Sequence, residues 1–107
     1  MRRTNSKRAN KMADQIKQEL SRIIVEESND PGLNLLSITG VRMNRDFSIA
    51  EVLYTHIDGK KKQKEIEKSL ARAKGFFKSR IASRLQLRHM PDLRFAWDTF
   101  LEEMIYE

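Results

Sequence analysis

The stretch EIEKSLARAKGFFKSRIASRLQLRHMPDLRFAWD, residues 65–98, combines a long helical pattern with a strand pattern. Its apolar residues recur at steps of three or four, which places them near one face of a helix. They are Ile66, Leu70, Ala73, Phe77, Ile81 and Leu85. Gly75 lies inside this pattern, and a glycine in a helix interior costs about 1 kcal/mol relative to alanine. The stretch therefore predicts two helical segments with a break or kink at Gly75, ended by Met90-Pro91.

Alternation of apolar and polar residues predicts three strands around this helical stretch. Residues 35–43 and 49–57 both alternate and are separated by Asn44-Arg45-Asp46, which favours an antiparallel hairpin with a short turn. Gly40 inside the first strand indicates a bulge. Residues 93–97 alternate again after Pro91 and predict the third strand.

The chain opens with a basic segment that leads into a helix. Asn5 and Ser6 are both suited to cap a helix N-terminus, and apolar residues at helical spacing follow to about Ser28. Cations near a helix N-terminus oppose the helix dipole at a cost of a few tenths of a kcal/mol each. Residues 2–11 are therefore either a solvated end or an arm that contacts phosphate, through Arg2, Arg3, Lys7, Arg8 and Lys11.

The predicted order is helix, strand, strand, helix, kink, helix, strand. Three strands covered on one face by helices form an α+β domain, here a single domain spanning residues 1–107. The long helical connection leaves room for the third strand to pair in parallel with an earlier one. Type II KH domains, which bind RNA, have this element order.

Composition restricts the classes of function. The chain has 107 residues, no cysteine and a net charge of +6, which favours a polyanionic partner such as nucleic acid. No apolar run is long enough to cross a bilayer, and the basic start lacks a secretory signal, so we expect a soluble cytoplasmic monomer. His56 and His89 are isolated, and no catalytic motif is present. We therefore expect no enzyme, no metal or other cofactor, no small-molecule substrate and no membrane partner.

Arg80, Arg84 and Arg88 recur every four residues and would form one column on a helix. No acidic residue lies between Ser69 and Pro91 to offset their repulsion, so we predict that the column binds RNA phosphates, with Lys74 and Lys78 as neighbours. The alternative is a solvated face whose aliphatic stems shield the edge of the core.

Three aromatic residues admit two interpretations. Tyr54, Phe95 and Trp97 lie in alternating strands, so we expect them in the core, although aromatic residues on a sheet surface can also stack on unpaired bases.

Gly75 also admits two interpretations: it either sets the angle between two helical segments or permits close packing of the helix on the sheet.

The chain resembles the ribosome-binding factor A family of bacterial small-subunit assembly factors. Short segments in the family's order carry the resemblance: Met12–Gln15, Ile16, Gln18–Leu20, Asp30–Leu33, Gly40–Asp46, Ala50–Val52, Ala73–Phe76, Arg80, Leu85–Phe95 and Asp98. The resemblance implies a KH-like fold in which the usual Gly-x-x-G loop is replaced by an Ala-x-Gly kink, here Ala73 to Gly75.

The resemblance also implies a function. Members bind the free small ribosomal subunit during late maturation of its RNA, near the neck and decoding region, leave before translation, and have no known catalytic activity. Asn44 stands where the family commonly has serine, and both residues suit a turn. Many members continue into a long charged tail, whose role is not carried over to this chain.

Two other functions fit the same residues. The first is a general binder of single-stranded RNA or DNA on the same fold. The second is a protein-interaction module that docks a partner strand at a sheet edge, with the positive charge serving solubility alone.

Overall fold

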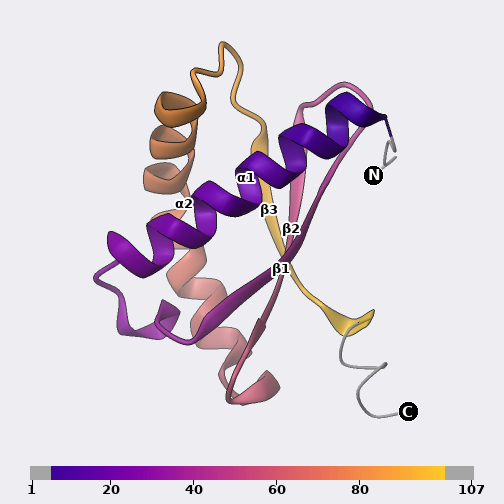
Figure 1. Ribbon diagram of the computed structural model, residues 1–107. Helices are drawn as coiled ribbons and strands as arrows, with labels where there is room; N and C mark the ends of the chain where they lie inside the picture. The colour runs from indigo at the N-terminus through magenta and orange to yellow at the C-terminus, as the bar shows by residue number, and fades with distance from the viewer. Residues whose placement is uncertain (1–5, 101–107) are drawn as a thin grey trace.

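The computed structural model describes residues 6–100. Two helices and three strands follow one another in the order α1, β1, β2, α2, β3 (Figure 1). Their bounds are α1 Lys7–Glu26, β1 Leu36–Met43, β2 Ile49–His56, α2 Gln63–Leu85 and β3 Asp92–Trp97, with short 3-10 turns at Pro31–Leu33 and Gly59–Lys62. The Ser6 side chain caps α1 by accepting a hydrogen bond from the Ala9 backbone N–H at 3.1 Å.

The sheet has the order β1-β2-β3 and is mixed. β1 and β2 pair antiparallel, whereas β2 and β3 pair parallel, so both predicted pairings are confirmed. The register of the hairpin shifts between Ile38 and Gly40, which confirms the bulge. The parallel pair begins where Ile49 aligns with Asp92, so the start of β3 lies beside the β1–β2 turn.

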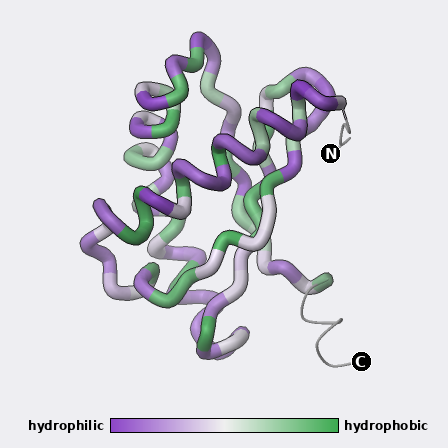
Figure 2. The backbone as a smooth tube through the Cα atoms, viewed as in Figure 1, coloured by the Kyte–Doolittle hydropathy of each residue, from purple (hydrophilic) through white to green (hydrophobic). Residues whose placement is uncertain are grey.

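One face of the sheet packs against both helices, and this layer is the core. Its largest buried residues include Tyr54, Phe77, Ile16, Leu20, Ile23 and Leu93. Tyr54 is 1 % exposed and meets Trp97 edge to face, with ring centroids 5.5 Å apart, so the core interpretation of these two aromatic residues is confirmed. Hydrophobic positions recur as separate bands along both helices, as amphipathic helices require (Figure 2).

Helix α2 is hydrogen-bonded without interruption through Gly75, so the predicted break into two helices is wrong. The helix nevertheless bends: its first half, pink in Figure 1, and its second half, orange, run in different directions. Gly75 is exposed, and a Cβ placed there would have no neighbouring atom within 4 Å. Close packing on the sheet therefore does not explain this glycine.

Helix α2 also ends earlier than predicted, at Leu85 rather than at Met90-Pro91. Gln86 adopts a left-handed conformation with φ 53°, and the Leu87 N–H donates to the Ala82 carbonyl at 3.0 Å, which closes the helix in a Schellman arrangement. Glycine usually occupies this position, so the sequence carried no signal for it. Arg88 consequently lies in the loop after α2 and is not part of an arginine column.

Candidate nucleic-acid interface

Arg80 and Arg84 lie where α2 faces α1, and acidic residues at the α1 side bind both. Arg84 Nη1 lies 3.2 Å from Glu19 Oε2, and Arg84 Nη2 lies 2.7 Å from Glu27 Oε2. Arg80 Nε is 3.7 Å from Glu27 Oε1. The prediction that no acid offsets these arginines is therefore wrong. We call Glu19, Glu27, Arg80 and Arg84 the interhelical cluster.

The carboxylates of this cluster are partly shielded from water. The side chains of Glu19 and Glu27 are 15 % and 23 % exposed, and that of Arg84 is 30 % exposed. A phosphate that approached Arg84 would have to displace two carboxylates already in contact with its guanidinium group. The arrangement therefore holds α1 against α2.

Lys74 and Lys78 lie on the opposite flank of α2, next to β3, and are not neighbours of Arg80 and Arg84 as predicted. Their Nζ atoms lie 2.8 Å and 3.3 Å from Asp92 Oδ1. Arg94 Nε is 3.9 Å from the other Asp92 oxygen. We call Lys74, Lys78, Asp92 and Arg94 the Asp92 cluster. It places three cations around one carboxylate.

The cations of the Asp92 cluster keep its carboxylate ionised. The hydrogen bond from Lys74 lowers the pKa of Asp92 most, and the bond from Lys78 and the charges of both lysines lower it further, against a smaller opposing effect of burial. Because one negative charge faces three positive ones, the cluster keeps a net positive charge.

The first turns of α1 carry Lys7, Arg8 and Lys11, which we call the N-terminal cluster. Within residues 6–100 no carboxylate lies within 4.0 Å of a charged nitrogen of these three residues. The structure thus places them in the first turns of the helix, where they oppose its dipole, without an ion pair to an acid of residues 6–100. Arg2 and Arg3, the other basic residues predicted to contact phosphate in this segment, lie outside the described residues.

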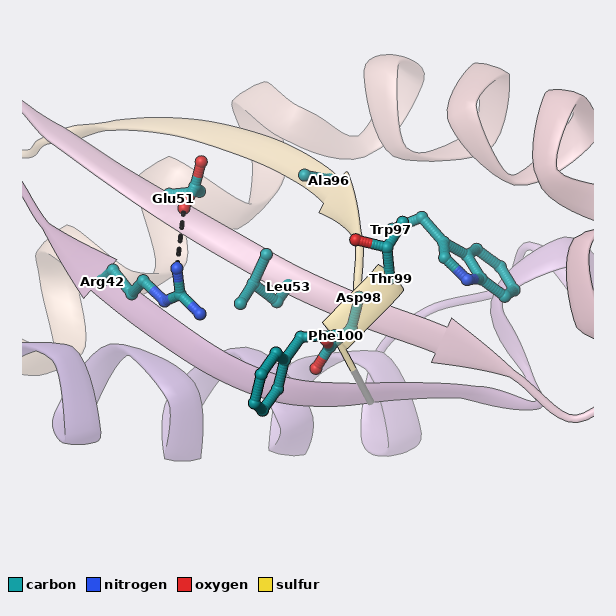
Figure 3. A pocket seen from close by; sticks show the side chains of 8 residues that line it. All are labelled: Arg42, Glu51, Leu53, Ala96, Trp97, Asp98, Thr99 and Phe100. Atoms are coloured by element: carbon teal, nitrogen blue, oxygen red, sulfur yellow. Dashed lines mark ion pairs between the residues drawn. The ribbon is translucent and has the colours of Figure 1, made fainter. Parts of the chain in front are cut away.

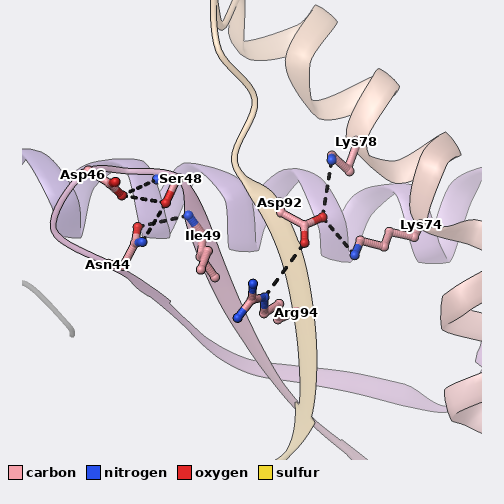
Figure 4. A network of polar contacts seen from close by, with 8 residues as sticks. All are labelled: Asn44, Asp46, Ser48, Ile49, Lys74, Lys78, Asp92 and Arg94. Carbon is pink, nitrogen blue, oxygen red and sulfur yellow. Dashed lines mark hydrogen bonds and ion pairs between the residues drawn. The ribbon is translucent and has the colours of Figure 1, made fainter. Parts of the chain in front are cut away.

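The β1–β2 turn lies beside the start of β3 and the Asp92 cluster (Figure 4), and it also contacts Arg8 of the N-terminal cluster. The guanidinium carbon of Arg8 lies 5.2 Å from the centroid of the Phe47 ring in this turn. On the other side, the Asp92 N–H donates to the Ser48 carbonyl at 2.8 Å. The turn therefore connects two groups of cations that come from different parts of the chain.

The backbone of this turn is constrained. Phe47 has φ 60°, a left-handed conformation that costs a non-glycine residue roughly 1–2 kcal/mol. Side-chain hydrogen bonds offset that cost: Asn44 Oδ1 accepts from the Ile49 N–H at 3.0 Å, and Asn44 Nδ2 donates to Ser48 Oγ at 2.8 Å. Ser48 Oγ in turn donates to Asp46 Oδ1 at 2.6 Å. A serine at position 44 is too short to make both of the bonds that Asn44 makes.

Sequence reasoning treated the same turn as a connection only and missed Arg45, which is exposed there. Bonds from the Ser48 hydroxyl and N–H lower the pKa of Asp46, so that this carboxyl is ionised and already bound within the turn. The sequence feature that could have identified Arg45 as a site residue is its position between two turn-forming residues, Asn44 and Asp46.

The face of the sheet away from the helices carries a shallow pocket with a volume of about 530 Å³ (Figure 3). Its charged side chains are already engaged: Arg42 Nη1 lies 4.0 Å from Glu51 Oε1, and Asp98 Oδ2 accepts from the Thr39 hydroxyl at 2.5 Å. Apolar side chains of Leu53 and Phe100 line the rest. This pocket offers no nucleophile paired with a base.

Residues 6–100 contain no group of three or more histidine or acidic residues placed to hold a metal ion. Neither helix has the length and the apolar character that crossing a bilayer requires.

Comparison with known proteins identifies the relatives of this chain. The family model for ribosome-binding factor A matches residues 8–106. Ribosome-binding factor A of Nitrosomonas eutropha is 37 % identical over 95 residues, which cover 89 % of this chain and 81 % of the relative. The Thiobacillus denitrificans protein of the same name is 40 % identical over 95 residues, covering 89 % and 77 %.

Solved structures agree in fold. The crystal structure of ribosome-binding factor A from Thermus thermophilus matches with a TM-score of 0.73 and 26 % identity, over 82 % of this chain and 93 % of that one. A homology model of the Thermus thermophilus factor, fitted into a cryo-EM map of its complex with the 30S subunit, matches with a TM-score of 0.68 and 26 % identity, over 85 % and 96 %.

Proposed function

The chain belongs to the ribosome-binding factor A family, and from this premise we propose that it binds the free 30S ribosomal subunit and its RNA during late maturation of that RNA. It acts as an assembly factor in the cytoplasm and as a monomer. The family is not catalytic, so membership confirms the prediction that the chain is not an enzyme.

The contact with RNA is proposed to centre on the N-terminal cluster. Lys7, Arg8 and Lys11 have no acidic partner within residues 6–100, and their position in the first turns of α1 costs stability. A phosphate backbone supplies the missing negative charge and releases counterions when it binds. The lack of an acidic partner for these three cations within residues 6–100 is the main observation that supports placing the site here.

The other predicted cations differ in how readily they can bind an RNA phosphate. Lys74 and Lys78 share one carboxylate, and each keeps a side chain about one third exposed, so both remain able to meet a phosphate. Arg80 and Arg84 serve mainly to hold the interhelical cluster, since phosphate would compete there with Glu19 and Glu27. Arg88 is exposed in the loop after α2 and adds a separate contact.

Co-sedimentation with purified free 30S subunits, repeated over a series of salt concentrations, tests this function. For three to five phosphate contacts, the slope of log affinity against log salt is expected to lie between roughly −2 and −4.5. Assembled 70S ribosomes, assayed in parallel, should bind far less of the protein. Affinity that does not change between low and moderate salt would overturn the electrostatic account.

Two additional experiments distinguish the proposed function from the other two candidate functions. Short single-stranded RNA in excess should fail to displace the protein from the subunit, whereas a general single-strand binder would be displaced. Neutralising Lys7, Arg8 and Lys11 together should abolish most of the binding, whereas a module that docks by adding a strand to the sheet edge would keep it.

A further inference from the structure

We propose that the β1–β2 turn is a second element of the RNA interface, in which Arg45 binds a phosphate of the 30S subunit beside those bound by Arg8 and Lys11. This inference rests on the function proposed above and adds a surface that the chain's cation pattern did not predict. The partner is the sugar-phosphate backbone of folded RNA, because an exposed arginine on a rigid turn can bind phosphate oxygens bidentately without reading sequence.

Arg45 is exposed, and it forms no ion pair with the described part of the chain. Within residues 6–100 no carboxylate lies within 4.0 Å of its guanidinium nitrogens. The acidic residue next to it, Asp46, uses its Oδ1 atom to accept from the hydroxyl and the N–H of Ser48, at 2.6 Å and 3.1 Å. Arg45 is therefore free to form the bidentate contact with phosphate oxygens that suits a guanidinium group.

Hydrogen bonds within the β1–β2 turn hold it rigidly before any partner arrives. Asn44, Asp46 and Ser48 bind one another through side chains (Figure 4), and the Phe47 N–H donates to the Asn44 carbonyl at 3.3 Å. A rigid support lowers the entropy that binding would otherwise cost. Apart from its own rotamers, Arg45 thus has little freedom to lose when it meets a phosphate.

The β1–β2 turn also positions a cation of α1, Arg8. The Arg8 guanidinium lies over the face of the ring of Phe47, whose backbone is left-handed. Stacking leaves the N–H groups at the edges of a guanidinium available to acceptors. Arg45 precedes Phe47 by two residues in the turn, so the contact between α1 and the turn brings Arg45 to the same end of the molecule as Lys7, Arg8 and Lys11. These residues supply four cations from two segments of the chain.

The opposing charges at this end of the molecule are few. Asp46 is committed to Ser48, and Asp92, beyond the turn, is shared by Lys74 and Lys78. Asp14 is exposed in the second turn of α1 and is the remaining acid near the N-terminal cluster in the sequence. The cations therefore remain in excess, which favours a polyanion over a protein surface of mixed charge.

The test compares Arg45→Gln with Arg45→Lys and with the control Arg22→Gln in the full chain. Arg22 is an exposed arginine near the other end of α1 that pairs with Glu19 at 3.5 Å, so its replacement makes the same change of net charge away from the turn. Affinity for free 30S subunits is measured by co-sedimentation across salt concentrations. Thermal unfolding of each variant reports whether the fold is intact.

We expect Arg45→Gln to weaken binding roughly fivefold at 0.15 M salt and to lower the salt slope by about one, as the loss of one phosphate contact requires. Arg45→Lys should keep the slope, because it keeps the charge, and Arg22→Gln should match the wild type. Equal losses in Arg45→Gln and Arg22→Gln would show an effect of net charge alone and would overturn the proposal.

The outcome also separates this inference from the proposed function. Wild-type protein that fails to bind free 30S subunits would contradict the proposed function itself. Wild-type protein that binds normally, together with an Arg45→Gln variant that binds equally well, would contradict only the role of the turn.

Discussion

The interhelical cluster and the N-terminal cluster contain the same kinds of cation, yet their surroundings differ. Arg80 and Arg84 of α2 are in contact with Glu19 and Glu27 at the α1 side. Lys7, Arg8 and Lys11, at the other end of α1, have no such partner within the described chain. The first group therefore stabilises the packing of two helices, while the second retains its charge for another molecule.

This difference shows that the spacing of cations along one helix does not reveal their role. Arg84 meets acids that lie 65 and 57 positions away in the chain, so the relevant partners are invisible to a pattern read within α2. A surface cation is a stronger candidate for binding RNA when the folded chain leaves it without an acid. The predictions below test this distinction in both clusters.

The largest effect is expected from replacing Lys7, Arg8 and Lys11 together with glutamine. Loss of three phosphate contacts, at roughly fivefold each in 0.15 M salt, should weaken binding to free 30S subunits about 100-fold. The melting temperature should stay the same or rise slightly, because the cations oppose the helix dipole. Co-sedimentation across a salt series and thermal unfolding provide the two measurements.

A variant with three lysines of the other basic segment replaced by glutamine, Lys61, Lys62 and Lys64, controls for the change of net charge. These exposed residues lie at the start of α2 and just before it, away from α1's first turns. If both triple variants lose the same affinity, the N-terminal cluster has no special role and the comparison between the two clusters fails.

Arg84→Ala tests the other side of the comparison. It leaves two partly buried carboxylates without their main cation and should cost about 1–2 kcal/mol of stability. For a domain of this size the melting temperature should fall by roughly 4–15 °C. Binding of the folded variant to 30S subunits should change less than twofold; a tenfold loss would restore the predicted role of Arg84 in binding RNA.

Much of the fold follows from local patterns in the sequence. The capping residue Ser6, the alternation in both strands of the hairpin, and the shift at Gly40 all act over a few residues, and each was predictable. The parallel pairing of β2 with β3 followed from the length of the connection between them. Gln86 was not predictable, because a left-handed glutamine has no propensity signal that would distinguish it from a helical one.

The candidate site was less accessible to sequence reasoning for a different reason. The sequence identifies charged residues as the relevant type, but which of these residues pair with an acid depends on contacts between distant segments. Lys74 and Lys78 were predicted beside Arg80 and Arg84, whereas they face Asp92 on the opposite flank of α2. Arg45 was missed because its importance comes from Arg8 and Phe47, which only the fold brings together.

Asp92→Asn should produce opposite changes in binding and stability. Removing this carboxylate frees Lys74 and Lys78 for phosphate, so affinity for 30S subunits should rise roughly fivefold, the effect of one added contact. The variant should be less stable than the wild type at neutral pH, because it loses the ion pairs with both lysines. Co-sedimentation at 0.15 M salt and thermal unfolding check the two effects.

The pH dependence of that stability difference has a defined sign. The pKa of Asp92 is lowered in the folded protein, chiefly by the hydrogen bond from Lys74, so its contribution is present above the unfolded pKa and is lost as pH falls through the folded one. The melting temperatures of wild type and Asp92→Asn should therefore converge in acid. A difference in melting temperature that persists in acid would show that the stability effect comes from packing. Equal binding of wild type and Asp92→Asn to 30S subunits would mean that the Asp92 cluster does not face the RNA.

The smallest effects are expected at Gly75, whose substitutions show how far the interface extends along α2. Gly75→Ala should raise stability by about 0.5–1 kcal/mol, because the position is exposed and an added Cβ meets no atom within 4 Å. Gly75→Val keeps stability within a few tenths of a kcal/mol of the wild type, since valine and glycine are both poor helix formers. The valine variant therefore reports on shape with little change in folding.

If the bent surface of α2 contacts the RNA, Gly75→Val should bind 30S subunits more weakly than its small change in melting temperature explains, while Gly75→Ala should bind better than the valine variant. Equal binding by wild type, Gly75→Ala and Gly75→Val would place this part of α2 outside the interface. The RNA contact would then centre on the N-terminal cluster and its neighbours across the β1–β2 turn, because those cations combine exposure with the lack of an acidic partner in the described chain.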